Sequence, residues 1–276
     1  MLSSVTCKNC GSKLQENYCA KCGEKRFDKK QLAVKHFVEE TFEGLVHFDN
    51  KLFRTIKTLF IKPGQLSLDY VEGRRAGYMK PIQLFVVINL LFFFLMAVNP
   101  YRLYLYNYIT FSPFTKFNTA AIVHDKVAHL GITQATYSYI FNERMRSESK
   151  ELIFVFIPLY AAMCWLFFAW YKRLIVEHLV FATHFVVFVL CWFFLQIYII
   201  GLPLFLIPKI RDAIDFDTFI SIVSSVVVGV YFSIASRRFY KAGIVWSLLT
   251  GLLIGITFLG LIQAYRILLF FKIIYL

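Results

Sequence analysis

The chain is poor in charged residues and rich in uninterrupted apolar runs. Charged side chains make up 17% of its 276 residues, whereas 58% are hydrophobic and 31 are phenylalanines. A soluble domain of this length would carry more charge and fewer long apolar runs. Several runs exceed the roughly 18 apolar residues that mark a membrane-spanning helix, and they are continuous rather than alternating, which argues against a β-barrel. We therefore predict an all-α integral membrane protein.

Several familiar motifs are missing. The first ten residues, MLSSVTCKNC, have no apolar core, so we expect no cleavable signal peptide and insertion from an internal span. The Walker, G-x-S-x-G and H-E-x-x-H patterns are absent from the sequence, which lowers the expectation of an enzyme.

Acidic residues are scarce relative to basic ones, and the formal net charge is +13. In a soluble protein this excess would suggest a nucleic-acid partner. In a membrane protein, cations instead flank the spans on the cytoplasmic side and meet anionic lipid headgroups. We therefore favour the lipid bilayer over nucleic acid as the partner of these basic residues.

The cysteines are few, six in all, but four of them lie in the first 22 residues. They form two C-x-x-C-G knuckles, and the glycine after each pair permits a left-handed turn. Four thiolates suit tetrahedral zinc and leave no position open for water, so we predict a structural zinc ribbon over residues 1–26. A redox or disulfide pair is the less favoured alternative, because the knuckle is duplicated without a surrounding βαβ pattern. The predicted ligands are Cys7, Cys10, Cys19 and Cys22.

Metal-binding cysteines must stay reduced, which predicts a cytoplasmic N-terminus. The ribbon also carries several lysines. These side chains could contact lipid headgroups or a cytosolic protein partner, and both readings stay open.

Residues 27–81 are expected to form an amphipathic, basic juxtamembrane region. Apolar residues recur at helical spacing over 31–48 and again in a helix that follows Asp49 and stops at Pro63-Gly64. A basic helix with a strong apolar face can lie in the membrane interface. Alternatively the same face packs on the membrane domain or on a second subunit, and the pattern does not distinguish these readings.

Three cations precede the first span: Arg74, Arg75 and Lys80. We interpret them mainly as a topology signal that holds this end inside. They are also candidates for clamping a phosphate or a lipid headgroup.

The transmembrane domain, 82–276, is predicted to contain about five spans. They cover approximately 82–98, 151–171, 179–200, 218–235 and 243–265, with an apolar C-terminus that can extend the last helix. An extracytoplasmic insert at about 99–150 is expected to hold two short helices broken at Gly131. The short inside loops are consistently basic, which supports an N-inside topology.

The last two spans carry small residues at every fourth position, which form ridges on which another helix can approach closely. One ridge contains Ser225 and Gly229, and the other contains Gly251 and Gly255. Because a short linker joins these spans, we expect them to pack on each other. A homodimer through Gly251 and Gly255 is the alternative.

The third span holds ionisable residues, which are expensive in lipid and therefore suggest a site. Glu177, His184 and Cys191 are seven residues apart and form one stripe that drifts by about 20° per step. His178 lies about 120° away from His184, so the two histidines cannot share one metal ion on a regular helix. Glu177 and His184 are the candidate catalytic pair. The alternative, which we favour, places Glu177 and His178 among the headgroups beside Lys172 and Arg173, with His184 bonding across helices.

A set of motifs extends through most of the chain. It comprises the two knuckles, Lys62-Pro63-Gly64, Tyr70-Val71-Glu72-Gly73-Arg74-Arg75, Tyr78, Pro81, Glu177-His178-Leu179-Val180-Phe181, His184 and Phe188. Together these residues resemble a bacterial family of unknown function, of Bacteroidetes type, that joins a short zinc ribbon to a multi-pass membrane domain. The resemblance implies a bacterial inner membrane and supplies no activity. Family members often carry a further histidine where this chain has Val186, which weakens any histidine-cluster chemistry here.

We therefore predict a multi-pass inner-membrane protein with a cytosolic zinc ribbon, acting as a scaffold or adaptor rather than as an enzyme. A small-solute or lipid transporter is one alternative, and it requires a polar path through several spans. A membrane-embedded enzyme acting on a lipid-like substrate through Glu177 and His184 is the other. It requires a lateral cavity that brings these two side chains together near Arg74 or Arg75.

Overall fold

The fold is taken from a computed structural model of the 276-residue chain. The structure describes residues 6–14, 17–26, 51–95, 102–149, 151–201, 203 and 216–275. The helix predicted over 31–48 lies outside these ranges. Most of the turn predicted between the third and fourth spans lies outside them as well. The described part is helical apart from isolated bridges in the ribbon, which confirms the all-α class.

Within the described residues, four helical stretches are long and apolar enough to cross a membrane. The first predicted span is represented by α4, Pro81–Leu95, which is apolar but has only 15 described residues, and 96–101 are not described. The helix α13 runs unbroken from Ile244 to Tyr275, so the C-terminus does extend the last predicted span. The four stretches are Ile153–Tyr171 with α8 (Phe156–Phe168), Ile175–Gly201 with α9 (Ile175–Leu195), Phe219–Tyr240 in α12 (Phe216–Tyr240), and α13.

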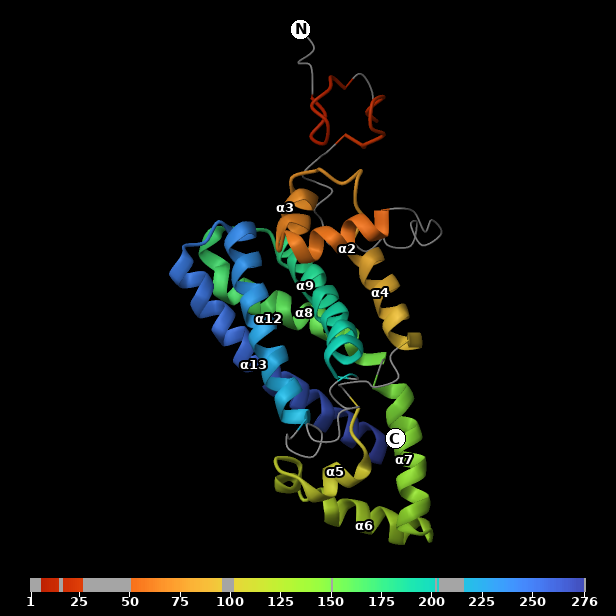
Figure 1. The fold of residues 1–276 in the computed structure, drawn as a ribbon. Helices are drawn as coiled ribbons and strands as arrows, with labels where there is room; N and C mark the ends of the chain where they lie inside the picture. Colours follow the sequence, from red (N-terminus) through yellow and green to blue (C-terminus); the bar gives the residue numbers. More distant parts are fainter. Residues whose placement is uncertain are drawn as a thin grey trace. The chain divides into compact units, whose positions relative to one another are not determined.

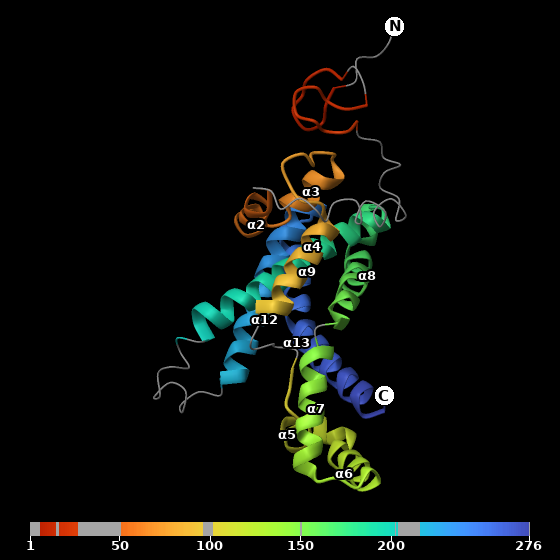
Figure 2. The ribbon, with the colours of Figure 1, turned by 90° about the vertical axis from the view of Figure 1, so that its right-hand side faces the viewer.

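The helix α9 is the central element of its unit, flanked by α3, α8 and α12 (Figures 1 and 2). In the span that contains α9, 72% of the most apolar 18-residue stretch is buried inside the protein, compared with at most 44% in the other three spans. A helix that is apolar on all sides is expected to be enclosed by others rather than to face lipid. The ionisable residues of the third predicted span therefore lie in the protein interior.

By contact, the chain divides into two compact units. Unit 1 comprises residues 1–92 and 156–255, and unit 2 comprises 93–155 and 256–276. Unit 2 contains most of the predicted insert, in which Gly131 with a φ of 63° separates α6 from α7, as the sequence predicts. The insert is joined to the C-terminal half of α13, because Tyr265 donates its hydroxyl hydrogen to the Ser149 carbonyl at 2.9 Å and Lys272 pairs with Glu148 at 3.0 Å. Its helices are α5 (Leu105–Thr110), α6 (Thr119–Leu130) and α7 (Gln134–Glu148).

The helices α12 and α13 pack on each other through their small residues, as predicted. A Cβ atom added to Gly251 would come within 2.5 Å of the Gly229 carbonyl oxygen, and one added to Gly255 would come within 2.9 Å of the Ser225 carbonyl oxygen. The Ser225 hydroxyl donates to the Gly255 carbonyl at 2.5 Å. The glycine face on which a homodimer would depend is thus occupied within the chain.

The helix α2, Lys51–Ile61, packs part of its apolar face on the membrane domain, whereas Phe53 on the same helix is 78% exposed. Leu52 and Leu59 are buried, and the Phe60 ring lies 5.3 Å from that of Phe188 on α9. The Tyr231 hydroxyl on α12 donates to the Leu59 carbonyl at 3.0 Å. These contacts support the packing alternative for the buried part of this face.

The turn between α2 and α3 (Gln65–Val71) explains why the sequence reads Lys62-Pro63-Gly64 there. Gly64 has a φ of 78°, and a Cβ at this position would lie 2.3 Å from the Ala235 carbonyl oxygen on α12. Only glycine accepts both the left-handed backbone and this close approach. The Pro63 carbonyl in turn accepts a hydrogen bond from Arg238 at 2.6 Å, so the turn is attached to α12.

Candidate metal centre and membrane-proximal pocket

The two cysteine knuckles have the same backbone structure, displaced by twelve residues. In the first, the Cys7 N–H donates to the Ser12 carbonyl at 2.8 Å, and in the second, the Cys19 N–H donates to the Glu24 carbonyl at 2.8 Å. Gly11 and Gly23 have φ values of 75° and 71°, which is the left-handed turn expected after each cysteine pair. The duplication seen in the sequence is therefore a duplication of local structure.

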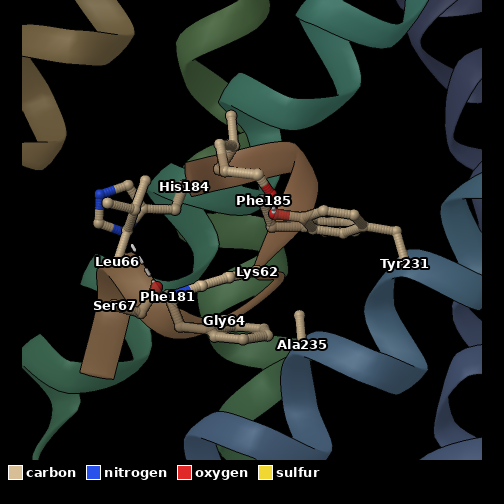
Figure 3. Close-up of a pocket in the computed structure, with 10 residues that line it drawn as sticks. Lys62, Gly64, Leu66, Ser67, Phe181, His184, Phe185, Tyr231 and Ala235 are labelled. Atoms are coloured by element: carbon tan, nitrogen blue, oxygen red, sulfur yellow. Dashed lines mark hydrogen bonds between the residues drawn. The ribbon is translucent and has the colours of Figure 1, made fainter. Parts of the chain in front are cut away.

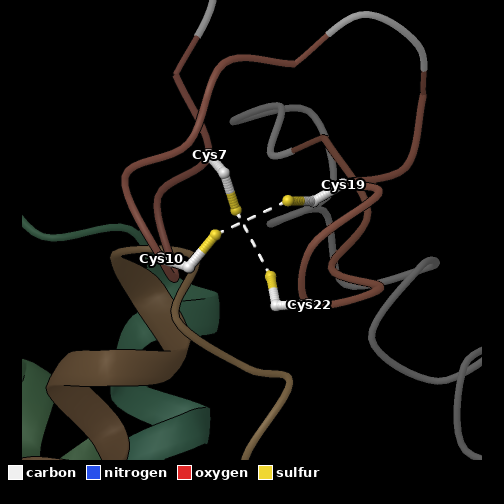
Figure 4. A group of neighbouring side chains, drawn as sticks. All are labelled: Cys7, Cys10, Cys19 and Cys22. Carbon is white, nitrogen blue, oxygen red and sulfur yellow. Dashed lines mark hydrogen bonds between the residues drawn. The ribbon is translucent and has the colours of Figure 1, made fainter.

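The four cysteine sulfurs converge on one point (Figure 4). All lie within 4.8 Å of one another, with Cys7 Sγ 3.6 Å from Cys22 Sγ and Cys10 Sγ 3.5 Å from Cys19 Sγ. These separations are too long for disulfide bonds, whose sulfurs lie about 2.05 Å apart. They approach the roughly 3.8 Å between ligands of a tetrahedron with zinc–sulfur bonds of about 2.3 Å. The donor set and its geometry fit a tetrathiolate metal site.

Neighbouring groups change the pKa values of the ribbon thiols. The Ser12 hydroxyl lies 2.8 Å from Cys10 Sγ and 3.2 Å from Cys19 Sγ. Its hydrogen bonds lower the pKa of Cys10 and lower the pKa of Cys19 to about 6. The Glu24 backbone lowers the pKa of Cys22. The nearby Cys10 and Cys7 sulfurs oppose this effect and outweigh it, so the pKa of Cys22 rises to about 11. Metal binding requires deprotonated thiols, so a cation shared by the four sulfurs would release their remaining protons.

The ribbon contacts the segment before α4 through Glu24. Its carboxylate accepts a hydrogen bond from the Arg75 backbone N–H at 3.2 Å. Burial raises the pKa of Glu24, although the Arg75 and Ala76 backbone groups oppose this shift.

Glu177 has a local structural role at the beginning of α9. Its carboxylate accepts the Leu174 backbone N–H at 2.9 Å and pairs with the Arg173 guanidinium at 3.2 Å. Arg173 also donates to the Phe239 carbonyl on α12 at 3.0 Å. A carboxylate at this position caps the helix and complements its dipole. The helix consequently begins at Ile175, four residues earlier than its apolar run predicts.

His184 lies deeper in α9 and bonds to another helix. It is 4% exposed, and its Nδ1 lies 2.9 Å from the Ser67 hydroxyl on α3 (Figure 3). His178 makes a separate contact, with Nδ1 2.8 Å from the Tyr240 hydroxyl on α12. Cys191 is half-buried further along α9. The residues of the α9 stripe thus have different partners, and the structure does not bring Glu177 and His184 to one shared partner.

The three candidate anion-binding residues, Arg74, Arg75 and Lys80, line a pocket that also contains His184. The pocket is small and open, with about 10 Å³ of space for the centre of a water molecule, and it does not contain Glu177. Arg74 is held by two carboxylates, Asp69 at 2.5 Å and Glu72 at 2.5 Å. Burial opposes the charge on Arg74, but these two bonds outweigh it and raise its pKa. The pocket is lined by Leu66, Tyr70, Arg74, Arg75, Tyr78, Met79, Lys80 and His184.

A second small pocket, with about 10 Å³ of space for the centre of a water molecule, lies where the α2–α3 turn meets α9 and α12 (Figure 3). It also contains His184, together with Lys62, Ser67 and Tyr231. Sequence reasoning did not identify Ser67 or Tyr240 as histidine partners. Both are ordinary polar residues in helices, and only the packing of α3 and α12 against α9 brings them to the imidazoles.

Residues 49–93 match a family described as "Protein of unknown function (DUF3667)". The matched segment holds 45 of the 276 residues and covers α2, α3, the linker with Arg74 and Arg75, and most of α4. It includes the Lys62-Pro63-Gly64 and Glu72–Arg75 motifs, whereas the ribbon and the Glu177–Phe188 segment lie outside it. No curated protein and no solved structure matches the chain.

Proposed function

We propose that this chain is a scaffold or adaptor of the bacterial inner membrane, with a structural zinc ribbon on the cytoplasmic side that recruits a protein partner. The observation that carries the proposal is the closed set of four cysteine sulfurs. A tetrathiolate site leaves no ligand position for water or substrate, so its zinc would fold the ribbon rather than catalyse a reaction. The predicted zinc ligands are Cys7, Cys10, Cys19 and Cys22, which are the four sulfurs of the cluster.

The contacts of the ionisable residues in α9 support a structural reading. Glu177 caps its own helix, and His184 joins α9 to α3. Each bond satisfies a buried polar group, which is what stability requires. An acid–base pair would instead need both side chains within reach of one substrate position.

The ribbon surface is suited to a partner because its lysines project outward. Lys8, Lys13, Lys21 and Lys25 are exposed, whereas two of the four cysteines are buried and two are half-buried. A small metal-folded module with an exposed basic surface can present fixed charges to an acidic protein surface.

The proposal is tested by photo-crosslinking in intact cells. A photoreactive amino acid at Lys13 or Lys25 should give one discrete protein adduct, which should disappear in the Cys10→Ser/Cys22→Ser variant. Cys191→Ser is the matched control, because it removes a thiol outside the ribbon and should leave the adduct unchanged. Adduct patterns that do not depend on Cys10 and Cys22, or the absence of any adduct at both positions, would contradict an adaptor role.

A further inference from the structure

The accessible side of α2 has no use in the adaptor role, and part of it is apolar. Phe53 and Ile61 are 78% and 64% exposed, near the two ends of the helix. Lys57 lies four residues from each of them, so the three side chains follow one side of the helix. Leu52 and Leu59, by contrast, are buried. One short helix therefore has a packed apolar side and an accessible side that mixes apolar and cationic residues.

The charge on this side of α2 is positive and unbalanced. From Lys51 to Lys62 the chain has four cations and no carboxylate. Lys51 is close enough to Glu24 for the two charges to attract each other. Within the described residues, Arg54, Lys57 and Lys62 are exposed and take part in no ion pair. Three cations of this short segment are therefore left to attract an anionic partner.

The packed side of α2 fixes the helix at the end of a membrane span. Tyr231 of α12 donates to the Leu59 carbonyl, and Arg238 of α12 donates to the Pro63 carbonyl just beyond the helix. In Figures 1 and 2, α2 lies across the direction of α12 and α4 rather than along it. A helix that lies across the ends of spans has the orientation of an interfacial helix, whose axis runs in the plane of the membrane surface.

The mixed composition of the accessible side fits the headgroup region better than water or hydrocarbon. In water, the apolar area of Phe53 and Ile61 would stay hydrated, which is unfavourable. In the hydrocarbon core, the charges of Arg54 and Lys57 would be costly. At the interface, the apolar groups reach the acyl boundary, while lysine and arginine extend their charged ends to the phosphates.

We propose that the accessible side of α2, formed by Phe53, Arg54, Lys57 and Ile61, lies in the headgroup region of the membrane and binds an anionic lipid surface. The partner is a surface rather than an enclosed ligand, so the contact requires no cavity. The packing and interfacial interpretations of α2 then both hold, on different sides of the same helix. The inference rests on the membrane location of the chain, but it needs neither zinc nor the protein partner of the adaptor role.

The test places a fluorescent amino acid at Phe53 of the full chain, in vesicles of phosphatidylglycerol and phosphatidylcholine in equal parts. A nitroxide on the acyl chain, close to the headgroup, quenches a probe that touches lipid, and dissolved acrylamide quenches a probe that faces water. The probe at Phe53 should be quenched by the nitroxide lipid and protected from acrylamide. Tyr18 of the ribbon, which is 60% exposed, is the matched position, and a probe there should show the reverse.

The charge preference is measured by placing the nitroxide on either of the two lipids. One lysine or arginine near an anionic surface corresponds to about a fivefold preference for it. Labelled phosphatidylglycerol should therefore quench the probe several-fold more efficiently than labelled phosphatidylcholine. Arg54→Gln/Lys57→Gln should remove most of this difference, with equal helix content by circular dichroism. Lys116→Gln, which removes an exposed cation of the insert, should leave the difference unchanged.

Three results would overturn the proposal. If acrylamide quenches the probes at Phe53 and Tyr18 equally, this side of α2 faces water. If the probe at Phe53 is protected from both acrylamide and labelled lipid, a second copy or another protein segment covers it. If the two labelled lipids quench it equally in the wild type, the partner is not anionic. Loss of the crosslinked adduct of the adaptor role would change none of these readouts, so the two proposals fail separately.

Discussion

Chemically active residues recur at regular spacing both in the ribbon and in the polar stripe of α9, but only the ribbon brings them together. In the ribbon, two cysteine pairs twelve residues apart bring four sulfurs within 4.8 Å of one another. In α9, polar residues seven apart go to separate partners: Glu177 to its own helix end and His184 to α3. A tight turn bends the chain back towards a common point, whereas a helix keeps residues seven apart about 10 Å from each other. A seven-residue spacing on one helix therefore does not bring side chains to a common ligand, whereas a pair of tight turns does.

The largest effect is expected from breaking the ribbon. Replacing Cys10 or Cys19 by serine should abolish stoichiometric zinc and unfold residues 6–26, since zinc supplies roughly 10–16 kcal/mol in ribbons of this kind. Metal analysis of the purified chain and its amide NMR spectrum measure these two losses. The Cys191→Ser control, a thiol of the α9 stripe, should keep one zinc per chain. Equal zinc in all three proteins would show that the cluster is not the metal site.

A smaller but substantial loss is expected at the close helix contacts. Gly64→Ala and Gly251→Ala should each destabilise unit 1 by about 2–4 kcal/mol, because the new Cβ meets backbone oxygen and Gly64 also needs a positive φ. Thermal unfolding in detergent micelles measures the change. Gly260→Ala is the matched control, since no atom lies within 4 Å of its added Cβ. That variant should be neutral or more stable by about 0.5–1 kcal/mol.

A double-mutant cycle tests the separate partners of the α9 residues. Ser67→Ala and His184→Gln should each cost about 1–3 kcal/mol and couple by about 1 kcal/mol, because they remove the same buried hydrogen bond. The cycle of Glu177→Gln with His184→Gln should be additive within about 0.5 kcal/mol. Strong coupling between Glu177 and His184 would restore the idea of a shared site.

The smallest effect is expected for Glu177→Gln alone. Glutamine can still accept the Leu174 N–H, so only the pair with Arg173 and the charge at the helix start are lost. We expect a destabilisation of about 0.5–1 kcal/mol. Chemical denaturation in micelles measures it, with Glu177→Ala as the comparison that also removes the cap. A loss of several kcal/mol in Glu177→Gln would mean that the charge itself is needed, as a functional carboxylate would require.

Much of the fold was predictable because apolar length and small-residue spacing are local properties. The runs over 151–171 and 218–235 became helices near the expected ends, and the glycines of α12 and α13 met as their spacing predicts. The beginning of α9 was placed four residues too late because the prediction followed the apolar run, whereas the Glu177 carboxylate caps the first turn beside Arg173. The face of α2 had two readings, and its contacts with Phe188 and Tyr231 support the packing reading, although Phe53 stays exposed.

By itself, the sequence determined the membrane class, the long spans and the four-cysteine cluster, since each depends on composition or on residues close along the chain. Only the tertiary structure decided that His184 bonds to Ser67, that Tyr240 lies against His178, and that the pocket beside His184 contains Arg74 and Arg75. The partners in these contacts are separated by more than 60 residues. Their meeting depends on how α3 and α12 pack around α9, and helical periodicity specifies the faces of a helix without specifying its neighbour.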